Sequence, residues 1–150
     1  MRSRFLGVLM ASALVSVVAA AQPAAERALA IPVQDAGLQW GPCPAFLPKG
    51  CEIAVLHGDP AKPNADIFFR VPGNAVIPHH WHSSAERMVL VSGELHVTYD
   101  GQPTVALKPG MYAYGPPKLG HDATCKSAEP CVLFIAFELP VDAVATEAKQ

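Results

Sequence analysis

Short runs in which apolar and polar residues alternate recur along the chain from residue 51 to residue 139. This alternation predicts β-strands, because successive side chains of an extended strand point to opposite faces. The expected strands cover residues 51–57, 67–71, 78–82, 87–91, 94–99, 104–107, 111–114, 121–125 and 132–139. Turn-forming residues separate the runs roughly every 8–12 residues. Asp100-Gly101 is a strong hairpin signal among them.

This rhythm of short strands and turns is typical of an all-β sandwich or barrel. The sequence after residue 38 contains neither an internal repeat nor a linker, so we expect one domain over residues 38–140. Residues 22–37 have two prolines and no sustained period, which predicts a flexible N-terminal arm. Residues 141–150 are rich in alanine and charged residues, so we expect a C-terminal tail that frays or forms one weak helical turn.

The first 21 residues differ in character from the rest of the chain. Arg2 and Arg4 precede an apolar run that begins at Phe5 and ends in three alanines at Ala21. A basic start, an apolar stretch and a small-residue exit are the features of a cleaved signal peptide, which we assign to residues 1–21. The alternative is an uncleaved membrane anchor, for which about 17 apolar residues is short. A cleaved signal predicts a periplasmic or secreted protein.

The composition limits the classes of partner. Hydrophobic residues are 51% of the chain and charged residues 16%, so a substantial core is expected rather than disorder. The formal net charge of -2 becomes −4 once Arg2 and Arg4 leave with the signal peptide, because nine Lys and Arg then oppose 13 Asp and Glu. A mildly acidic chain without a basic cluster argues against nucleic acid or an anionic membrane as partner.

The chain has four cysteines, an even number that predicts disulfides in an exported protein. Three pairings are compatible with four cysteines. We favour Cys43–Cys51 and Cys125–Cys131, because each pair brackets a short segment that contains proline. The alternative is a structural zinc site made by all four thiolates, but neither pair has the C-x2–4-C spacing that zinc favours.

The densest candidate chemistry lies between Gly73 and Gly93. His80 and His82 stand two residues apart, so on an extended strand their side chains point to one face. Glu86 keeps the same parity if the segment stays roughly extended. Two imidazoles and a carboxylate on one side would suit a divalent metal ion.

The remaining histidines of this region do not fit that pattern. His79 is out of phase with its neighbours, His57 begins a loop, and His96 lies on the strand face opposite the apolar residues, so we expect none of the three to be a ligand. Met88 and Leu90 share the parity of Glu86, and we expect them to line the interior beside the metal.

The same stretch resembles the first motif of the cupin superfamily. That motif is a glycine, then His-x-His, three residues, Glu, six residues and a glycine, here Gly73, His80-Trp81-His82, Glu86 and Gly93. The family usually has five residues between the first glycine and the first histidine, whereas this chain has six.

A later stretch resembles the second cupin motif more loosely. Gly110, Pro116 and His121 fall at the family's spacing. Lys118 stands where a second glycine is usual, and Cys125 stands where an asparagine is usual. The lysine therefore raises a question about the turn before His121.

The resemblance covers about residues 51–138 and implies a double-stranded β-helix, or jelly-roll barrel. It also implies one divalent metal held by His80, His82, Glu86 and His121, and it implies that dimers are common. Three imidazoles and one carboxylate suit Zn, Mn, Fe, Cu, Ni or Co, and an octahedral ion would keep two positions for water, substrate or O2. Glu86 could also act as a base, as the resemblance allows.

Three hypotheses for function follow. The first is an enzyme, a metal-dependent oxygenase or a related lyase or isomerase that acts on a small organic substrate. The second is an exported module that binds a metal or a small ligand without turnover. The third is a structural domain stabilised by metal. The resemblance does not choose among them, because cupins host many activities and several non-enzymes.

Overall fold

The computed structural model describes residues 26–146, and within this range the chain forms eleven β-strands and no helix. The chain divides into residues 1–30 and residues 31–150, and every strand lies in the second unit. Over the described residues, no helix is long and apolar enough to cross a membrane. The predicted signal peptide, residues 1–21, lies outside the described range and stays a prediction.

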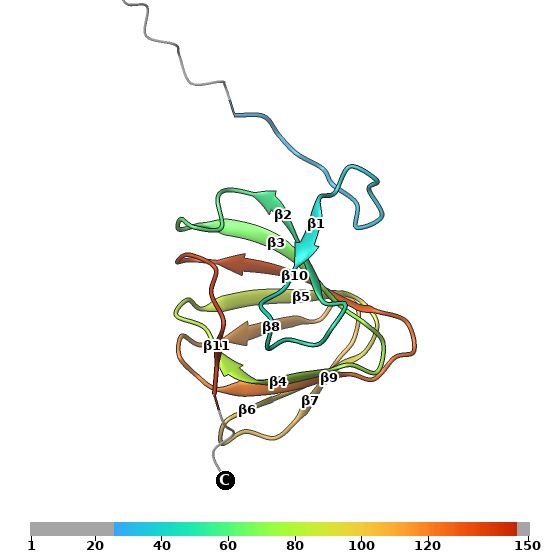
Figure 1. Ribbon diagram of the computed structural model, residues 1–150, viewed down its shortest axis with the longest axis vertical. Coiled ribbons are helices and arrows are strands. Elements are labelled where there is room, and N and C mark those ends of the chain that lie inside the picture. The colour runs from blue at the N-terminus through green and yellow to red at the C-terminus, as the bar shows by residue number, and fades with distance from the viewer. Residues whose placement is uncertain (1–25, 147–150) are drawn as a thin grey trace, which may run out of the picture. The chain divides into compact units, whose positions relative to one another are not determined.

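Two antiparallel sheets make up this unit (Figure 1). One sheet has six strands in the order β1-β2-β3-β10-β5-β8, and the other has five in the order β11-β4-β9-β6-β7. The strands are β1 Trp40–Pro42, β2 Glu52–His57, β3 Ala65–Val71, β4 Val76–Trp81, β5 Glu86–Ser92, β6 Leu95–Tyr99, β7 Val105–Leu107, β8 Tyr112–Gly115, β9 His121–Cys125, β10 Cys131–Phe137 and β11 Val144–Ala145. The all-β expectation is therefore confirmed, and β1 and β11 are strands that the alternation did not predict.

The main core lies between the two sheets, where alternate side chains of each strand meet. In β5, β6 and β9 the buried positions recur every second residue, as the sequence pattern predicts. Met88 is 5% exposed and Leu90 is fully buried, and both belong to this core. Removing this apolar surface from water supplies the main force that holds the sheets together.

A second, smaller apolar cluster covers the outer face of the six-stranded sheet. Phe68 of β3 and Val132 of β10 are buried there, although they face away from the main core. Val33 and Leu38 pack against this cluster together with Trp40. Val33 thus packs against the sheet from within residues 22–37, the segment expected to be a flexible arm.

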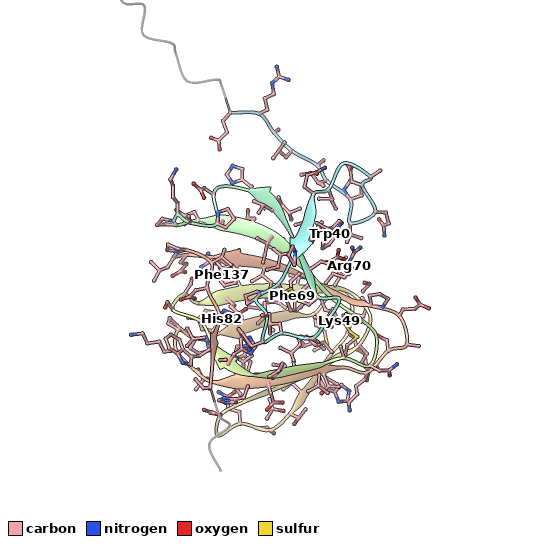
Figure 2. All side chains as sticks on the ribbon, in the orientation of Figure 1. Trp40, Lys49, Phe69, Arg70, His82 and Phe137 are labelled. Atoms are coloured by element: carbon pink, nitrogen blue, oxygen red, sulfur yellow. A yellow bond between two sulfur atoms is a disulfide. The ribbon has the colours of Figure 1, made fainter. Side chains whose placement is uncertain are left out.

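Trp40 is held on this outer face by a charged neighbour. The Arg70 guanidinium lies over the Trp40 ring, 3.9 Å from its centre (Figure 2). It also pairs with the Glu52 carboxylate. A cation over an indole face is attracted by the ring quadrupole. These contacts explain why the chain pairs with β2 as early as residue 40.

The four cysteines form two disulfides, Cys43–Cys51 and Cys125–Cys131, with Cα–Cα distances of 5.5 and 5.8 Å. This is the pairing favoured from the sequence, and it leaves no thiolate for a structural zinc site. The first disulfide closes the loop between β1 and β2, and the second closes the turn between β9 and β10. The first bridge thus joins the paired strands β1 and β2, whereas the second links β9 of the five-stranded sheet to β10 of the six-stranded sheet.

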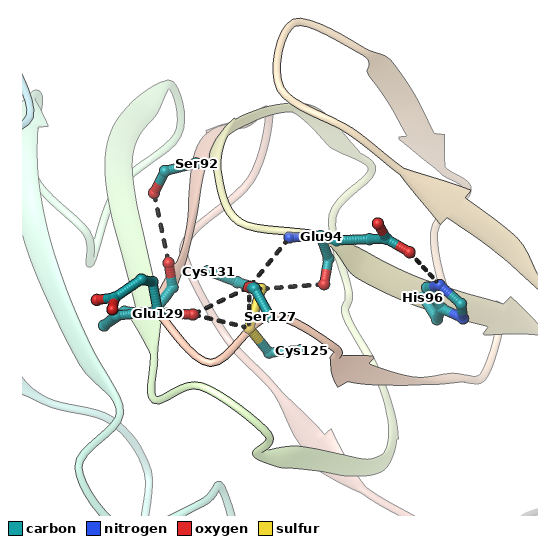
Figure 3. Close-up of a disulfide and its surroundings, with 8 residues drawn as sticks. Ser92, Glu94, His96, Cys125, Ser127, Glu129 and Cys131 are labelled. Carbon is teal, nitrogen blue, oxygen red and sulfur yellow. Dashed lines mark hydrogen bonds and ion pairs between the residues drawn. A yellow bond between two sulfur atoms is a disulfide. The ribbon is translucent and has the colours of Figure 1, made fainter.

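The second disulfide is surrounded by a small polar network (Figure 3). The Ser127 hydroxyl donates to the carbonyl of Glu129 at 2.9 Å and accepts the N–H of Glu94 at 3.2 Å. Gly93 lies against the same bridge, because a Cβ there would approach the Cys131 sulfur to 2.8 Å and its φ is +84°. The last glycine of the first motif is therefore required by close packing and by a left-handed backbone.

Candidate metal centre

The candidate ligands come from both sheets and meet at one end of the sandwich. In the five-stranded sheet, His80 of β4 pairs directly with His121 of β9, and His121 pairs with Tyr99 of β6. In the six-stranded sheet, Glu86 of β5 lies beside Phe137 of β10. Strand register therefore brings together residues that are far apart in the sequence.

Glu86 reaches this position by a route that differs from the one expected. The strand β4 ends at Trp81, and residues 82–85 cross to the other sheet, where Glu86 begins β5. The Glu86 carboxylate thus approaches His80 and His82 from the opposite sheet. The sequence pattern instead predicted all three residues on one extended segment.

Ser84 fixes this crossing segment. Its side chain is buried, and its hydroxyl accepts the backbone N–H groups of Glu138 at 2.8 Å and Leu139 at 3.0 Å. The same hydroxyl donates to the carbonyl of Ala85 at 2.8 Å. All the hydrogen-bonding capacity of the Ser84 hydroxyl is used in holding the start of β5 against the end of β10.

The additional residue before His80 coincides with an irregularity in β4. The pairing of β4 with β9 shifts register between Ile77, opposite Ala123, and His80, opposite His121. Pro78, which has no N–H to donate, lies inside this shift. Because the bulge contains one more residue, both Ile77 and His80 point inward, and His79 points away from the cluster.

Four buried side chains converge at this end of the barrel. Ring nitrogens of His80, His82 and His121 all lie within 4.8 Å of one another, a grouping that could hold a metal ion. Glu86 Oε1 lies 3.3 Å from His82 Nε2, and Glu86 Oε2 lies 3.6 Å from His121 Nε2. Each of the four residues is less than 9% exposed, so all four groups are buried.

Backbone carbonyls orient all three imidazoles. His80 Nδ1 donates to the carbonyl of Pro78 at 2.7 Å, His121 Nδ1 donates to that of Leu119 at 3.3 Å, and His82 Nδ1 donates to that of Asp142. A proton held on Nδ1 leaves Nε2 with its lone pair, which is the arrangement found in metal-binding histidines. His82 Nε2 is buried and has no hydrogen-bond partner within residues 26–146. The donor set therefore fits a divalent ion.

Burial controls the protonation of these groups in the metal-free protein. Loss of solvation, assisted by neighbouring imidazoles, lowers the pKa of His80 to about 4 and that of His121 to about 3. Both rings are consequently neutral at pH 7 and able to act as ligands. Burial raises the pKa of Glu86, an effect that the His82 charge opposes.

Lys118 resolves the question about the turn before His121. Its φ is 61°, in the left-handed region that glycine adopts freely, and its N–H donates to the carbonyl of His82 at 2.8 Å. The turn of the second motif is therefore formed with lysine in the place of glycine, and it connects directly to a proposed ligand.

The C-terminal segment covers the site. Residues 141–143 line the cavity beside the histidines, and β11 pairs with the end of β4, with Ala145 opposite His80. Asp142 contributes twice, since its carbonyl accepts from His82 and its Oδ1 accepts the N–H of Ser83 at 2.8 Å. Within the expected C-terminal tail, residues 144–145 form β11, and the N–H of Thr146 donates to the carbonyl of His79 at 3.1 Å. Figure 1 shows β11 beside β4.

The other histidines lie outside the cluster. His79 is bonded to the Asp100 carboxylate at 2.9 Å and to the Thr146 hydroxyl at 2.7 Å. His96 is partly exposed and bonded to Glu94. His57 ends β2. None of the three belongs to the metal-compatible group found among the described residues.

A cavity of about 240 Å³ opens from the histidine cluster into the barrel. Tyr99 lines it, and the Tyr99 hydroxyl is buried without a hydrogen-bond partner among residues 26–146. Burial and the Glu86 charge raise the pKa of Tyr99, so its hydroxyl keeps its proton at neutral pH. Sequence analysis missed this residue. Its inward parity with Leu95 and Val97 was visible, but its proximity to His121 depends on strand pairing.

Comparison with known proteins agrees with this architecture. Residues 67–137 match the family model described as Cupin domain. No curated protein matches this chain. Three solved structures share the fold, as follows. A DMSP lyase from Ruegeria pomeroyi has 21% identity and a TM-score of 0.62, over 73% of this chain and 61% of the lyase. An RmlC-like cupin from Shewanella frigidimarina has 21% identity and a TM-score of 0.58, over 70% and 86%. Oxalate decarboxylase from Bacillus subtilis has 22% identity and a TM-score of 0.56, over 65% and 28%.

These solved structures establish the fold and not the reaction, because the identities are low and this chain spans only about three fifths of the lyase. The match to the family model, the two-sheet barrel and the residues of the first motif agree with one another. Residues 67–137 of the chain therefore form a cupin domain.

Proposed function

We propose that His80, His82, Glu86 and His121 hold one divalent metal ion, and that the protein is an enzyme acting on a small organic molecule. The observation that supports this most directly is the convergence of three carbonyl-oriented imidazoles and a carboxylate at the mouth of a cavity. A purely structural metal site would need no cavity beside it. When bound, the ion would act as a Lewis acid toward a substrate oxygen or O2.

Within this proposal Glu86 has two roles. Its two oxygens lie near two different imidazoles, so it can complete the ligand set from the opposite sheet. Burial raises its pKa, which makes its carboxylate a stronger proton acceptor than an exposed one. We propose that Glu86 is also the general base of the reaction.

A non-catalytic binding module is the second candidate. Apart from the four proposed ligands, only Tyr99 and Asp142 among the described lining residues could exchange a proton with a ligand. A protein that binds a ligand without converting it would need no more acid–base groups than these. The two disulfides support a location in an oxidising compartment, and with the expected signal peptide we propose the periplasm or the exterior of the cell.

Metal analysis of purified protein tests the ligand set. The chain without residues 1–21 should contain one ion of Zn, Mn, Fe, Cu or Ni, and His80→Ala or Glu86→Gln should lower the metal content strongly. His96→Ala is the matched control, because the side chain of this histidine bonds to Glu94 away from the ligand cluster, so its loss should leave the metal content unchanged. Wild-type metal content in the His80→Ala protein would refute the assignment.

Turnover separates the two candidates. The metal-loaded protein should consume O2 or convert substrate with members of a panel of 1,3-diketones, phenolics and thiols, and Glu86→Gln should abolish that activity. Saturable binding without any conversion across the panel would favour the binding module.

A further inference from the structure

The cavity is divided sharply into a polar end and an apolar body. Its six polar or charged lining residues are His80, His82, Glu86, Tyr99, His121 and Asp142. Glu86 and His121 each begin a strand, and Tyr99 ends one, at the end of the barrel where the proposed ligands meet. Four are the proposed ligands, so only Tyr99 and Asp142 remain for other contacts.

The body of the cavity is hydrocarbon. Leu95, Val97 and Ala123 line it from the five-stranded sheet, and Ile67, Leu133 and Ile135 line it from the six-stranded sheet. Among the described lining residues there is no Lys, Arg, Ser, Thr, Asn or Gln. A charged or strongly polar group placed in this region would lose its water and gain no partner, which is costly.

The charge of the proposed metal centre fits one anionic ligand. A divalent ion with the Glu86 carboxylate and three neutral imidazoles carries one net positive charge, while the Asp142 carboxylate, which lines the same end, accepts the N–H of Ser83. One negative head group bound directly to the ion would neutralise the charge of the centre. A second negative group would be buried against hydrocarbon without a counter-ion, and the energetic penalty for an unpaired buried charge is large.

Tyr99 has a donor that the folded chain leaves unused. Its side chain is 9% exposed, and its hydroxyl has no partner among residues 26–146. A Cβ built on Gly115 would lie 2.7 Å from Tyr99 Oη and 3.1 Å from Glu86 Oε2, so the hydroxyl and the carboxylate border the same small space. An oxygen bound beside Glu86 would therefore be within reach of this donor.

We infer that the cavity takes a small molecule with one oxygen-bearing head group and an apolar body, and that Tyr99 donates a hydrogen bond to the head group. This rests on the proposed metal site, which receives the same head group. The size is limited by the volume of about 240 Å³, equal to about eight water-sized groups at roughly 30 Å³ each. Molecules with charges at both ends are excluded by the body of the cavity.

Straight-chain carboxylates test this inference with probes of known chemistry. Calorimetric titration of the metal-loaded protein with acetate, butyrate and hexanoate should show affinity that rises about four-fold per methylene, as expected for burial of hydrocarbon. Glutarate, which is close to hexanoate in size but has a second carboxylate, should bind at least ten-fold more weakly than hexanoate. Equal affinities for hexanoate and glutarate, or no dependence on chain length, would overturn the inference.

Two variants separate the head group from the body. Tyr99→Phe should weaken acetate and hexanoate by the same factor, roughly ten-fold, because one hydrogen bond to a charged group is lost. Ala123→Leu fills the apolar body of the cavity. The affinity for hexanoate should therefore fall to that for acetate, and the affinity for acetate should stay unchanged. Unaltered binding in either variant would contradict the role given to that residue.

Metal content is measured on each protein before the titration, and circular dichroism verifies its fold. A wild-type protein that binds no metal would refute the proposed function, and the inference with it. A metal-loaded protein that prefers glutarate would refute the inference alone.

Discussion

Acidification should destabilise the metal-free protein through two buried histidines. Burial lowers the pKa of His80 to about 4 and that of His121 to about 3, whereas the ordinary value of 6.5 applies to the unfolded chain. Below pH 6.5 these two histidines therefore become protonated in the unfolded state, while they stay neutral in the folded state. Folding stability is fully present above that pH and is lost as the pH falls toward the folded pKa values.

The size of the effect follows from the pH interval. At pH 5 an unfolded imidazole is about 1.5 pH units below its pKa, while the folded imidazoles are still neutral, so each histidine costs about 2 kcal/mol. The two together lower the free energy of unfolding by about 4 kcal/mol relative to pH 7.5. Glu86 acts in the opposite direction, because its raised pKa lets the folded state hold a proton at higher pH.

The Glu86→Gln variant removes the opposing carboxyl group and isolates the histidines. Urea unfolding of this variant with a metal chelator, at pH 7.5 and at pH 5, should show the loss of about 4 kcal/mol. Adding His121→Asn should reduce the loss to about 2 kcal/mol, and comparing the two proteins cancels the titration of all other groups. The same loss in both proteins would refute the reasoning.

Three further predictions concern the segments that support the site. Ser84→Ala should lower the free energy of unfolding by about 2–4 kcal/mol in urea denaturation, because two buried N–H groups lose their acceptor. Deletion of residues 141–150 should weaken metal binding by roughly 10–100-fold in a competition titration, because His82 loses the Asp142 carbonyl. Lys118→Gly should raise the free energy of unfolding by about 1 kcal/mol, because glycine adopts the left-handed backbone without strain.

Each of these predictions has a clear contrary result. Ser83→Ala is the control for Ser84→Ala, because alanine at position 83 keeps the backbone N–H that bonds to Asp142. If Ser83→Ala lowered the free energy of unfolding as much as Ser84→Ala, the role given to the Ser84 hydroxyl would be wrong. Unchanged metal affinity after the deletion would show that the Asp142 carbonyl does not orient the ring. Lys49 does not have a positive φ, so Lys49→Gly should not raise the free energy of unfolding. If it raised that free energy as much as Lys118→Gly does, backbone strain at Lys118 could not be the cause.

Local spacing was enough to predict much of this protein. Alternation predicted nine of the eleven strands, β2 to β10, because the two-residue period of a strand is visible in the order of the residues. The Cys43–Cys51 and Cys125–Cys131 disulfides join cysteines at most eight residues apart in the sequence, and the short proline-bearing segments between them favoured this pairing over the two others. The His80, His82 and Glu86 set was visible for the same reason.

Local spacing also misled where the chain leaves a strand. Parity along one strand placed Glu86 beside His82, yet the carboxylate arrives from the other sheet after the crossing at residues 82–85. The tail beyond residue 140 has no strong pattern, because β11 is only two residues long and forms by pairing with β4 rather than by its own propensity.

The sequence by itself determined the strand pattern, the disulfide pairs and the first motif, because each depends on residues close together in the chain. Tertiary structure alone decided that Tyr99 lies beside His121, that the Asp142 carbonyl orients His82, and that the cavity is apolar beyond its ligands. These relations depend on antiparallel register and on how two sheets face each other. Both are set by packing over the whole barrel, which no local pattern encodes.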